Sequence, residues 1–215
     1  MAGQLYQQLR PKAFDEFIGA EEAIMQLRMS ESGFVLISGP VGCGKTSLAL
    51  AWCLERFGVA LQEQQTIYKM DECYLEHMHA ANFDLDLLRE RNFFFQRIPT
   101  FLIVDEAQDL LEKRQQSKLK VIPQRPDLTL VLVTQDPSQL EKSIRDRCAS
   151  IRVGPLNIQE LRPMVARACD FRGIPCTQEL LRALNRAQVF RPRAILQVVD
   201  AVSRGLAPEA AVVGQ

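Results

Sequence analysis

The residues of this chain with the most obvious chemistry lie at 39–47, which read GPVGCGKTS and match the pattern G-x-x-x-x-G-K-[ST]. The match follows an apolar run, FVLIS, and precedes a helix-like stretch, SLALAWCLERF. Glycines in such a loop let backbone N–H groups turn toward phosphates, and the helix that follows points its positive end at them. A glycine-rich turn without a ligand is the alternative, but the Lys-Thr pair favours a phosphate site.

This loop predicts a site for ATP and Mg²⁺. Lys45 is expected to reach the β- and γ-phosphates, and Thr46 to hold the metal ion. The predicted nucleotide-binding residues are the whole loop and the start of its helix: Gly39, Pro40, Val41, Gly42, Cys43, Gly44, Lys45, Thr46 and Ser47.

A second stretch, FLIVDEAQ at 101–108, supplies two carboxylates. Four apolar residues predict a buried strand, and Asp105 emerges at its carboxyl end, where open α/β sheets bind ligands. Asp105 is expected to complete the Mg²⁺ shell, and Glu106 to orient or deprotonate the attacking water as a catalytic residue. An ordinary pair of acids at a strand end is the alternative.

The elements that must position these residues alternate between apolar β-rich runs and amphipathic stretches. Strands are expected at 34–38, 66–70, 101–105, 128–134 and 150–153. Helices are expected at 46–57, 85–96, 137–145 and in a piece after Gln108. From Gly154 onward the pattern is helical only, at 158–171, 177–187 and 192–203, with Asn157 and Thr177 as N-caps. The fold class is therefore α/β, a five-stranded parallel sheet at 1–154 followed by a small all-α domain at 155–215.

Composition excludes several classes of protein. Hydrophobic residues are 47% and charged residues 24%, which argues against disorder, collagen and coiled coil. The net charge is zero, but from Ile151 onward nine arginines and no lysine stand against five acids. That excess fits an anionic partner or a solvated helical surface.

The six cysteines are scattered, without a CxxC pair, which indicates a reducing compartment rather than a disulfide framework. Cys73, His77 and His79 lie close together, yet no second cluster offers a fourth zinc ligand, so we expect no zinc site. The chain shows neither a signal-peptide pattern at its start nor an apolar run long enough for a membrane span. A cytoplasmic protein without membrane contact is expected.

Taken in order, four stretches resemble AAA+ ATPases, and among them clamp-loader subunits of the replication factor C and DNA polymerase III gamma type. They are YQQLRPKAFDEFIGAEEAI at the N-terminus, the two stretches described above (Walker A at 39–46 and Walker B at 101–108), LVLVTQDPSQLEKSIRDRC, and FRPRAILQVVDAV. Together they extend from residue 5 to about 203. The resemblance implies a P-loop NTPase core of the AAA+ type with a helical lid.

Roles for further residues come from this resemblance. The N-terminal segment is expected to pack around adenine through Arg10, Pro11, Ile18 and Gly19. Thr134 is expected to be sensor 1, a polar catalytic contact to the γ-phosphate or the attacking water.

The resemblance also implies two catalytic arginines. Arg147 is the expected arginine finger, which acts on the nucleotide of a neighbouring subunit. Asp146 stands where the family has serine, so Arg145 remains a candidate for the finger. Arg193 is the expected sensor 2 residue of the lid, with Arg191 as the alternative.

The implied function is that of an ATP hydrolase in a homo- or hetero-oligomer of AAA+ subunits. It would load a sliding clamp, or a similar ring-shaped replication protein, onto double-stranded or primed DNA. The helical collar domain of clamp loaders is not evident in this sequence. The alternative is therefore a DNA-bound filament or ring regulator, of the helicase-loader or transposition type, which recruits another DNA enzyme. A subunit that only donates its finger is disfavoured by the intact Lys45, Thr46, Asp105 and Glu106.

Overall fold

The computed structural model describes residues 4–30, 33–60, 66–70 (backbone only), 73–84, 98–110, 116, 119–122 and 124–213. Within them, six strands form one sheet in the order β2-β3-β4-β5-β1-β6. The strands are β1 (Gly33–Ser38), β2 (Thr66–Met70), β3 (Cys73–His79), β4 (Thr100–Asp105), β5 (Leu128–Thr134) and β6 (Cys148–Arg152).

Five of these strands, from β3 to β6 in the order above, run parallel, which confirms the predicted five-stranded parallel sheet. One of the five parallel strands is not the strand that was predicted. The strand expected at 66–70 is β2, an antiparallel edge strand, and β3 takes the fifth parallel place. The sequence of β3, CYLEHMH, carries Glu and His, so it lacks the apolar run of a buried strand. Its Glu76 is buried nevertheless, and it accepts a hydrogen bond of 2.5 Å from the Tyr74 hydroxyl.

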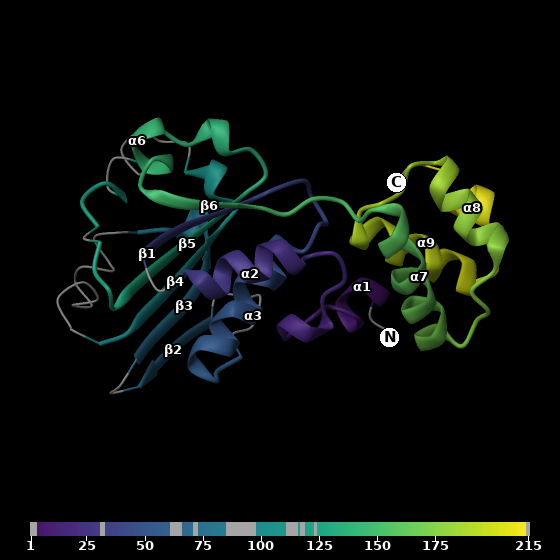
Figure 1. The fold of residues 1–215 in the computed structure, drawn as a ribbon, viewed down its shortest axis with the longest axis horizontal. Helices are drawn as coiled ribbons and strands as arrows, with labels where there is room; N and C mark the ends of the chain where they lie inside the picture. The colour runs from purple at the N-terminus through teal and green to yellow at the C-terminus, as the bar shows by residue number, and fades with distance from the viewer. Residues whose placement is uncertain are drawn as a thin grey trace.

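Apolar residues fill both faces of the sheet because alternate side chains of a strand point to opposite sides. In β1, Val35 and Ile37 join the cluster beneath helices α2 (Glu21–Met29) and α3 (Lys45–Phe57). Phe34 and Leu36 join a second cluster, on the face that α6 (Lys142–Arg145) covers through Ile144. Figure 1 shows α2 and α3 lying together across the sheet.

The helices expected after the sheet are present within a residue or two of their predicted bounds. They are α7 (Ile158–Arg172), α8 (Gln178–Arg186) and α9 (Pro192–Ser203). Asn157 caps α7 by a capping box with Glu160, and the Thr177 hydroxyl accepts the N–H of Leu180. After α9 the chain forms a short helix, α10 (Pro208–Ala211), which packs on α8 and α9 with Ala211 buried.

Other predicted helices have mixed outcomes. The helix at 46–57 is confirmed and begins one residue earlier, at Lys45. The stretch at 137–145 divides into a 3₁₀ helix, η4 (Pro137–Gln139), and the short α6. Gln108 itself lies in a 3₁₀ helix, η3 (Ala107–Asp109). Most of the helical piece expected after Gln108 lies outside the described residues, and the described residues 116 and 119 are helical. The helix expected at 85–96 lies outside the described residues. No helix in the described part of the chain is long and apolar enough to cross a membrane.

The N-terminal segment connects the sheet to the helices α7–α10, called here the helical bundle. Leu5 and Tyr6 of α1 (Leu5–Gln8) pack into the bundle core, as does Ile18. Phe14, in the 3₁₀ helix η1 (Phe14–Glu16), packs into the core beneath α3 instead. Figure 1 shows α1 beside the helical bundle, away from the sheet, and α1 contacts α9. Since Leu5 and Tyr6 belong to the bundle core, a division into domains at 154 stays a prediction.

We expect Leu5→Ala to weaken this connection. Leu5 is buried in the bundle core, and truncating a buried leucine costs about 2–5 kcal/mol. Urea denaturation of the variant and the wild type would measure the loss. Gln8→Ala is the matched control, because Gln8 is exposed in the same helix. Equal stability of Leu5→Ala and wild type would contradict this packing.

Candidate nucleotide site

The loop between β1 and α3 is shaped by backbone that requires glycine. A Cβ atom on Gly39 would lie 1.9 Å from the carbonyl oxygen of Val153, so no larger residue fits there. Gly42 has a φ of +80°, in the left-handed region that side chains disfavour. The predicted loop at 39–46 is therefore a tight cradle that leads directly into the amino end of α3, as phosphate binding needs.

Lys45 and Thr46 occupy the first turn of α3 and face the carboxyl end of β4. The Lys45 ammonium is mostly buried and donates a hydrogen bond of 3.0 Å to the carbonyl of Pro40, across the mouth of the loop. Burial lowers the pKa of Lys45, while the nearby Glu106 opposes that shift. The Thr46 hydroxyl donates to Asp105 Oδ2 at 2.9 Å.

Asp105 brings a carboxylate to the place where Mg²⁺ is expected. Burial would raise its pKa, but His77, the Thr46 hydroxyl and the backbone N–H of Glu106 together hold the pKa below the usual value. His77 Nε2 lies 3.8 Å from Asp105 Oδ2. A hydroxyl and an ionised carboxylate side by side are hard oxygen donors, so these residues fit Mg²⁺ beside a nucleotide.

The P-loop, with Lys45 and Thr46, lines a pocket, and Glu106 lines it too. The backbone of Glu106 is in the left-handed region, with φ +52°, which is unusual for a residue other than glycine. Its carboxylate accepts hydrogen bonds from Gln108 Nε2 at 2.5 Å and from Gln135 Nε2 at 3.0 Å. Sequence reasoning missed both glutamines. Their signal was available, since Gln108 closes the Walker B stretch and Gln135 follows the residue predicted to be sensor 1.

Thr134 ends β5 next to these groups, but its side chain is fully buried. Its hydroxyl donates to Gln108 Oε1 at 2.7 Å. Thr134 is therefore connected to Glu106 through Gln108. Direct contact between Thr134 and a phosphate stays a prediction.

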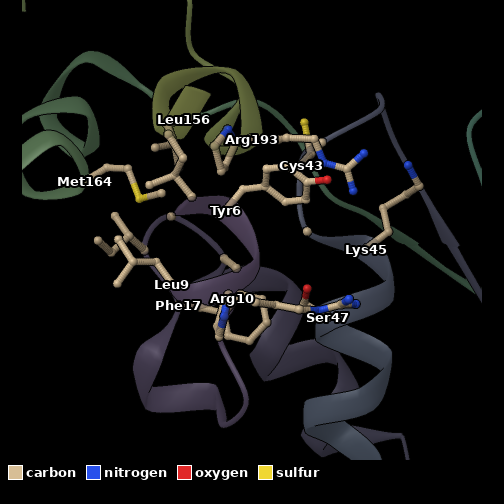
Figure 2. Close-up of a pocket in the computed structure, with 18 of the residues that line it drawn as sticks. Tyr6, Leu9, Arg10, Phe17, Cys43, Lys45, Ser47, Leu156, Met164 and Arg193 are labelled. Carbon is tan, nitrogen blue, oxygen red and sulfur yellow. The ribbon is translucent and has the colours of Figure 1, made fainter. Parts of the chain in front are cut away.

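The N-terminal segment and the helical bundle form the other walls of the pocket (Figure 2). The four residues predicted to surround adenine all line it: Arg10, Pro11, Ile18 and Gly19. Sequence reasoning did not identify Tyr6, Leu156 and Met164, which add apolar surface from α1 and from the start of the bundle. Mostly apolar walls beside a polar phosphate loop suit a nucleotide base.

Both sensor 2 candidates lie at the amino end of α9, against the loop. The backbone N–H of Arg193 donates to the carbonyl of Gly42 at 3.1 Å, and its guanidinium lies 5.2 Å above the ring of Tyr6. Figure 2 shows Arg193 and Tyr6 side by side over the P-loop. Burial raises the pKa of the Cys43 thiol, and the nearby Arg191 opposes that shift. The P-loop, α9 and α1 thus meet at Arg193.

The expected arginine finger, Arg147, lies far from this pocket. Arg147 precedes Cys148, which pairs with Phe34 at the amino end of β1, whereas the P-loop follows the carboxyl end of that strand. Five residues of strand separate them, about 16 Å. The Arg147 guanidinium donates to the carbonyls of the segment at 119–122 and lies 4.6 Å from the centre of the Phe34 ring. Arg147 therefore cannot complete the pocket of its own chain.

Cys73, His77 and His79, the residues considered for a zinc site, all lie on β3. His77 approaches Asp105, and His79 Nε2 lies 3.7 Å from Asp109 Oδ2. In the described part of the chain, no group of three or more His, Cys, Asp or Glu side chains is arranged around a metal position.

A parallel sheet with a P-loop after β1 and a Walker B carboxylate after β4 defines a P-loop nucleoside triphosphatase. The model of the ATPase family associated with various cellular activities (AAA) matches residues 35–156, more than half of the chain. The chain belongs to this AAA family of ATPases. The predicted AAA+ fold and the predicted class of enzyme are confirmed at this level.

Curated relatives include replication proteins. DNA polymerase III subunit gamma/tau of Mycobacterium tuberculosis is 27% identical, over 94% of this chain and 39% of the relative. The replication factor C small subunit of Aeropyrum pernix is 23% identical, over 90% of this chain and 61% of the relative. The resemblance to clamp-loader subunits is thus confirmed, at low identity. The chain spans about two fifths of the first of these relatives and about three fifths of the second.

Among solved structures, a variant of RuvB from Thermotoga maritima superposes with a TM-score of 0.66. It is 19% identical, and the match covers 95% of this chain and 71% of that one. This likeness confirms the fold, from the sheet through the helical bundle.

We expect Gly42→Ala to weaken ATP binding at least about tenfold, a loss of about 1.4 kcal/mol. A Cβ atom there would lie 2.9 Å from Arg193 Cβ, so α9 would have to move off the loop. Titration with a fluorescent ATP analogue measures the change in Kd.

Gly58→Ala is the matched control, because Gly58 has a similar φ of +68° but nothing within 4 Å of the added carbon. That variant should keep the wild-type Kd. Equal affinity in both variants would show that contact between α9 and the loop does not shape the pocket.

Proposed function

We propose that this chain is an ATP-hydrolysing subunit of an oligomeric AAA+ assembly that loads a ring-shaped replication protein, such as a sliding clamp, onto DNA. The observation that carries the hydrolytic part is the convergence of Thr46, Asp105 and Glu106 at one edge of the sheet. The part concerning DNA is supported by the similarity to two replication proteins, which extends over at least nine tenths of this chain.

Each residue of the site has a chemical role in this proposal. Lys45 neutralises charge on the β- and γ-phosphates, and Thr46 and Asp105 hold Mg²⁺, which polarises the phosphate oxygens. Glu106 orients a water molecule and accepts its proton as the water oxygen attacks the γ-phosphorus. The bond from that phosphorus to the bridging oxygen breaks, and ADP leaves with that oxygen.

A second subunit completes the site in this proposal. A guanidinium near the γ-phosphate stabilises the transition state and contributes about 10³–10⁵ in rate in enzymes of this kind. Arg147 lies at the amino edge of the sheet, opposite its own nucleotide pocket, so it could face the pocket of a neighbour. Arg145, at the end of α6, is the other candidate. Arg147 would have to leave the carbonyls at 119–122 to do so. Among the described residues, no partner hydrogen-bonds the buried Nε atom of Arg145.

The bundle provides the means by which nucleotide state could move a subunit. Its helix α9 touches the P-loop directly, through Arg193 and Gly42. Binding of ATP between loop and bundle would fix the angle between them, and release of phosphate would free it. A ring or spiral of such subunits would hold DNA mainly through its phosphates, so binding would be insensitive to sequence and would weaken with salt.

We expect Glu106→Gln to bind ATP with wild-type Kd and to lower the turnover rate by about 10²–10⁴. The amide keeps the shape of the side chain but cannot take a proton from water. A coupled ATPase assay with DNA present, beside titration of an ATP analogue, measures both quantities. Wild-type turnover in this variant would remove Glu106 as the base.

Mixing experiments test whether the site is shared. Lys45→Ala keeps its arginines and Arg147→Ala keeps its P-loop, so the mixture should recover part of the ATPase activity that each lacks alone. The same mixture with Arg145→Ala in place of Arg147→Ala identifies the finger. If both mixtures assemble, as mass measurement would verify, but hydrolyse no faster than their components, the shared site is refuted.

Mass measurement with an ATP analogue, with and without DNA, tests the proposed assembly. A closed small oligomer is the expected result for a loader. Oligomers that grow with the length of the DNA, without a clamp protein present, would favour the filament-forming regulator instead.

A further inference from the structure

An amide bridge connects the Walker B glutamate to the end of β5. The side chain of Gln108 donates from Nε2 to Glu106 Oε2 at 2.5 Å. Its Oε1 accepts from the Thr134 hydroxyl at 2.7 Å and from the backbone N–H of Gln135 at 3.2 Å. Both ends of one primary amide are therefore used, one on the sheet and one on the carboxylate.

The orientation of this amide follows from its partners. The backbone N–H of Gln135 can only donate, so the atom of Gln108 that faces it must be the acceptor, Oε1. The Nε2 group then points toward Glu106, whose carboxylate can only accept when it is ionised. The backbone at the end of β5 thus fixes the orientation of the Gln108 amide, so that its Nε2 faces Glu106.

Thr134 supports this arrangement. Its hydroxyl is fully buried and carries a single proton, which the shortest contact, at 2.7 Å, directs to Gln108; the carbonyl of Asp136, at 3.2 Å, is the other acceptor. The same hydroxyl accepts the N–H of Asp136 at 3.2 Å. In this arrangement Thr134 is connected to Glu106 through Gln108.

The backbone at Glu106 makes the contact possible. Its left-handed conformation, with φ +52°, turns the chain into η3, where the N–H of Asp109 donates to the Glu106 carbonyl at 2.8 Å. Residue 108 consequently lies beside the side chain of residue 106. A non-glycine residue in this conformation is strained, and such strain clusters at functional sites.

The described residues hydrogen-bond only one oxygen of the Glu106 carboxylate. Both amides, from Gln108 and from Gln135, donate to Oε2. No donor from the described part of the chain is bonded to Oε1. Glu106 lines the nucleotide pocket, whereas Gln108 is not among the described residues that do. A carboxylate that is held by one oxygen from outside the pocket keeps its other oxygen available to a water molecule.

We propose that Gln108 is a positioning residue for hydrolysis: its amide locks the Glu106 carboxylate to the end of β5, with Oε1 left for the attacking water. This inference rests on the proposed role of Glu106 as the base. Misplacement of a reacting group by about 1 Å can cost on the order of 10²-fold in rate. Loss of the bridge should therefore slow hydrolysis about 10- to 100-fold without changing the affinity for ATP.

The test uses Gln108→Met, which keeps the length of the side chain and removes both hydrogen bonds. Gln108→Glu keeps an acceptor for the strand end but sets a second carboxylate against Glu106, so it should be at least as slow. Single-turnover hydrolysis of labelled ATP gives the rate, and titration of an ATP analogue gives Kd. Gln139→Ala is the matched control, because that exposed glutamine touches Asp136 and not Glu106, and it should behave as wild type.

A double variant separates positioning from general damage. If Gln108 acts only through Glu106, Gln108→Met should lower the rate about 10- to 100-fold in wild type and should have no effect in the Glu106→Gln background. An equal loss in both backgrounds would overturn the inference. So would a loss of ATP affinity as large as the loss in rate, since it would show a structural role.

The outcomes also distinguish this inference from the proposed function. If Glu106→Gln abolishes turnover while Gln108→Met hydrolyses ATP at the wild-type rate, the positioning role of Gln108 is refuted. The proposed role of Glu106 as the base then remains. If Glu106→Gln turns ATP over normally, the proposed role of Glu106 is refuted, and the role of Gln108 is refuted with it.

Discussion

The hydrogen bond from the Thr46 hydroxyl to the Asp105 carboxylate is the contact on which the site depends. It joins the helix after β1 to the end of β4, two strands that are separated in the sheet by β5. Parallel strands bring their carboxyl ends to one edge, so residues 59 positions apart along the chain meet there. The same edge sets the place of Glu106 and of the amides that hold it. The sheet therefore fixes the distances that the chemistry of phosphate transfer requires.

The helical bundle contributes what the sheet cannot. Its first helix and the N-terminal segment form the apolar wall of the pocket, and α9 rests on the P-loop through the carbonyl of Gly42. Leu5 lies in the bundle core although it stands at the other end of the sequence. A nucleotide in this pocket would touch sheet, N-terminal segment and bundle together. Its binding energy could thus be used to fix their relative position, which is how a motor subunit would convert ligand state into movement.

Sequence predicted the parts of the site whose chemistry is local. A glycine-rich loop before a helix and two acids after an apolar strand are together typical of a nucleotide site, and Asn157 and Thr177 cap helices as their types suggest. The strand β3 escaped prediction because Glu76 makes it polar, and the burial of that carboxylate depends on the Tyr74 hydroxyl and on strand pairing. Gln108 and Gln135 escaped for a similar reason, since their meaning arises from a network across two strand ends.

In the proposed function, this pocket is half of an active site and a neighbouring subunit supplies the other half. The most direct measurement is the ATPase rate per subunit as a function of protein concentration, at saturating ATP and Mg²⁺ with DNA present. We expect a rate per subunit that is low in dilute protein, rises as subunits associate, and levels off when mass measurement shows that assembly is complete. A rate per subunit that stays constant from dispersed monomers to the full assembly would contradict it.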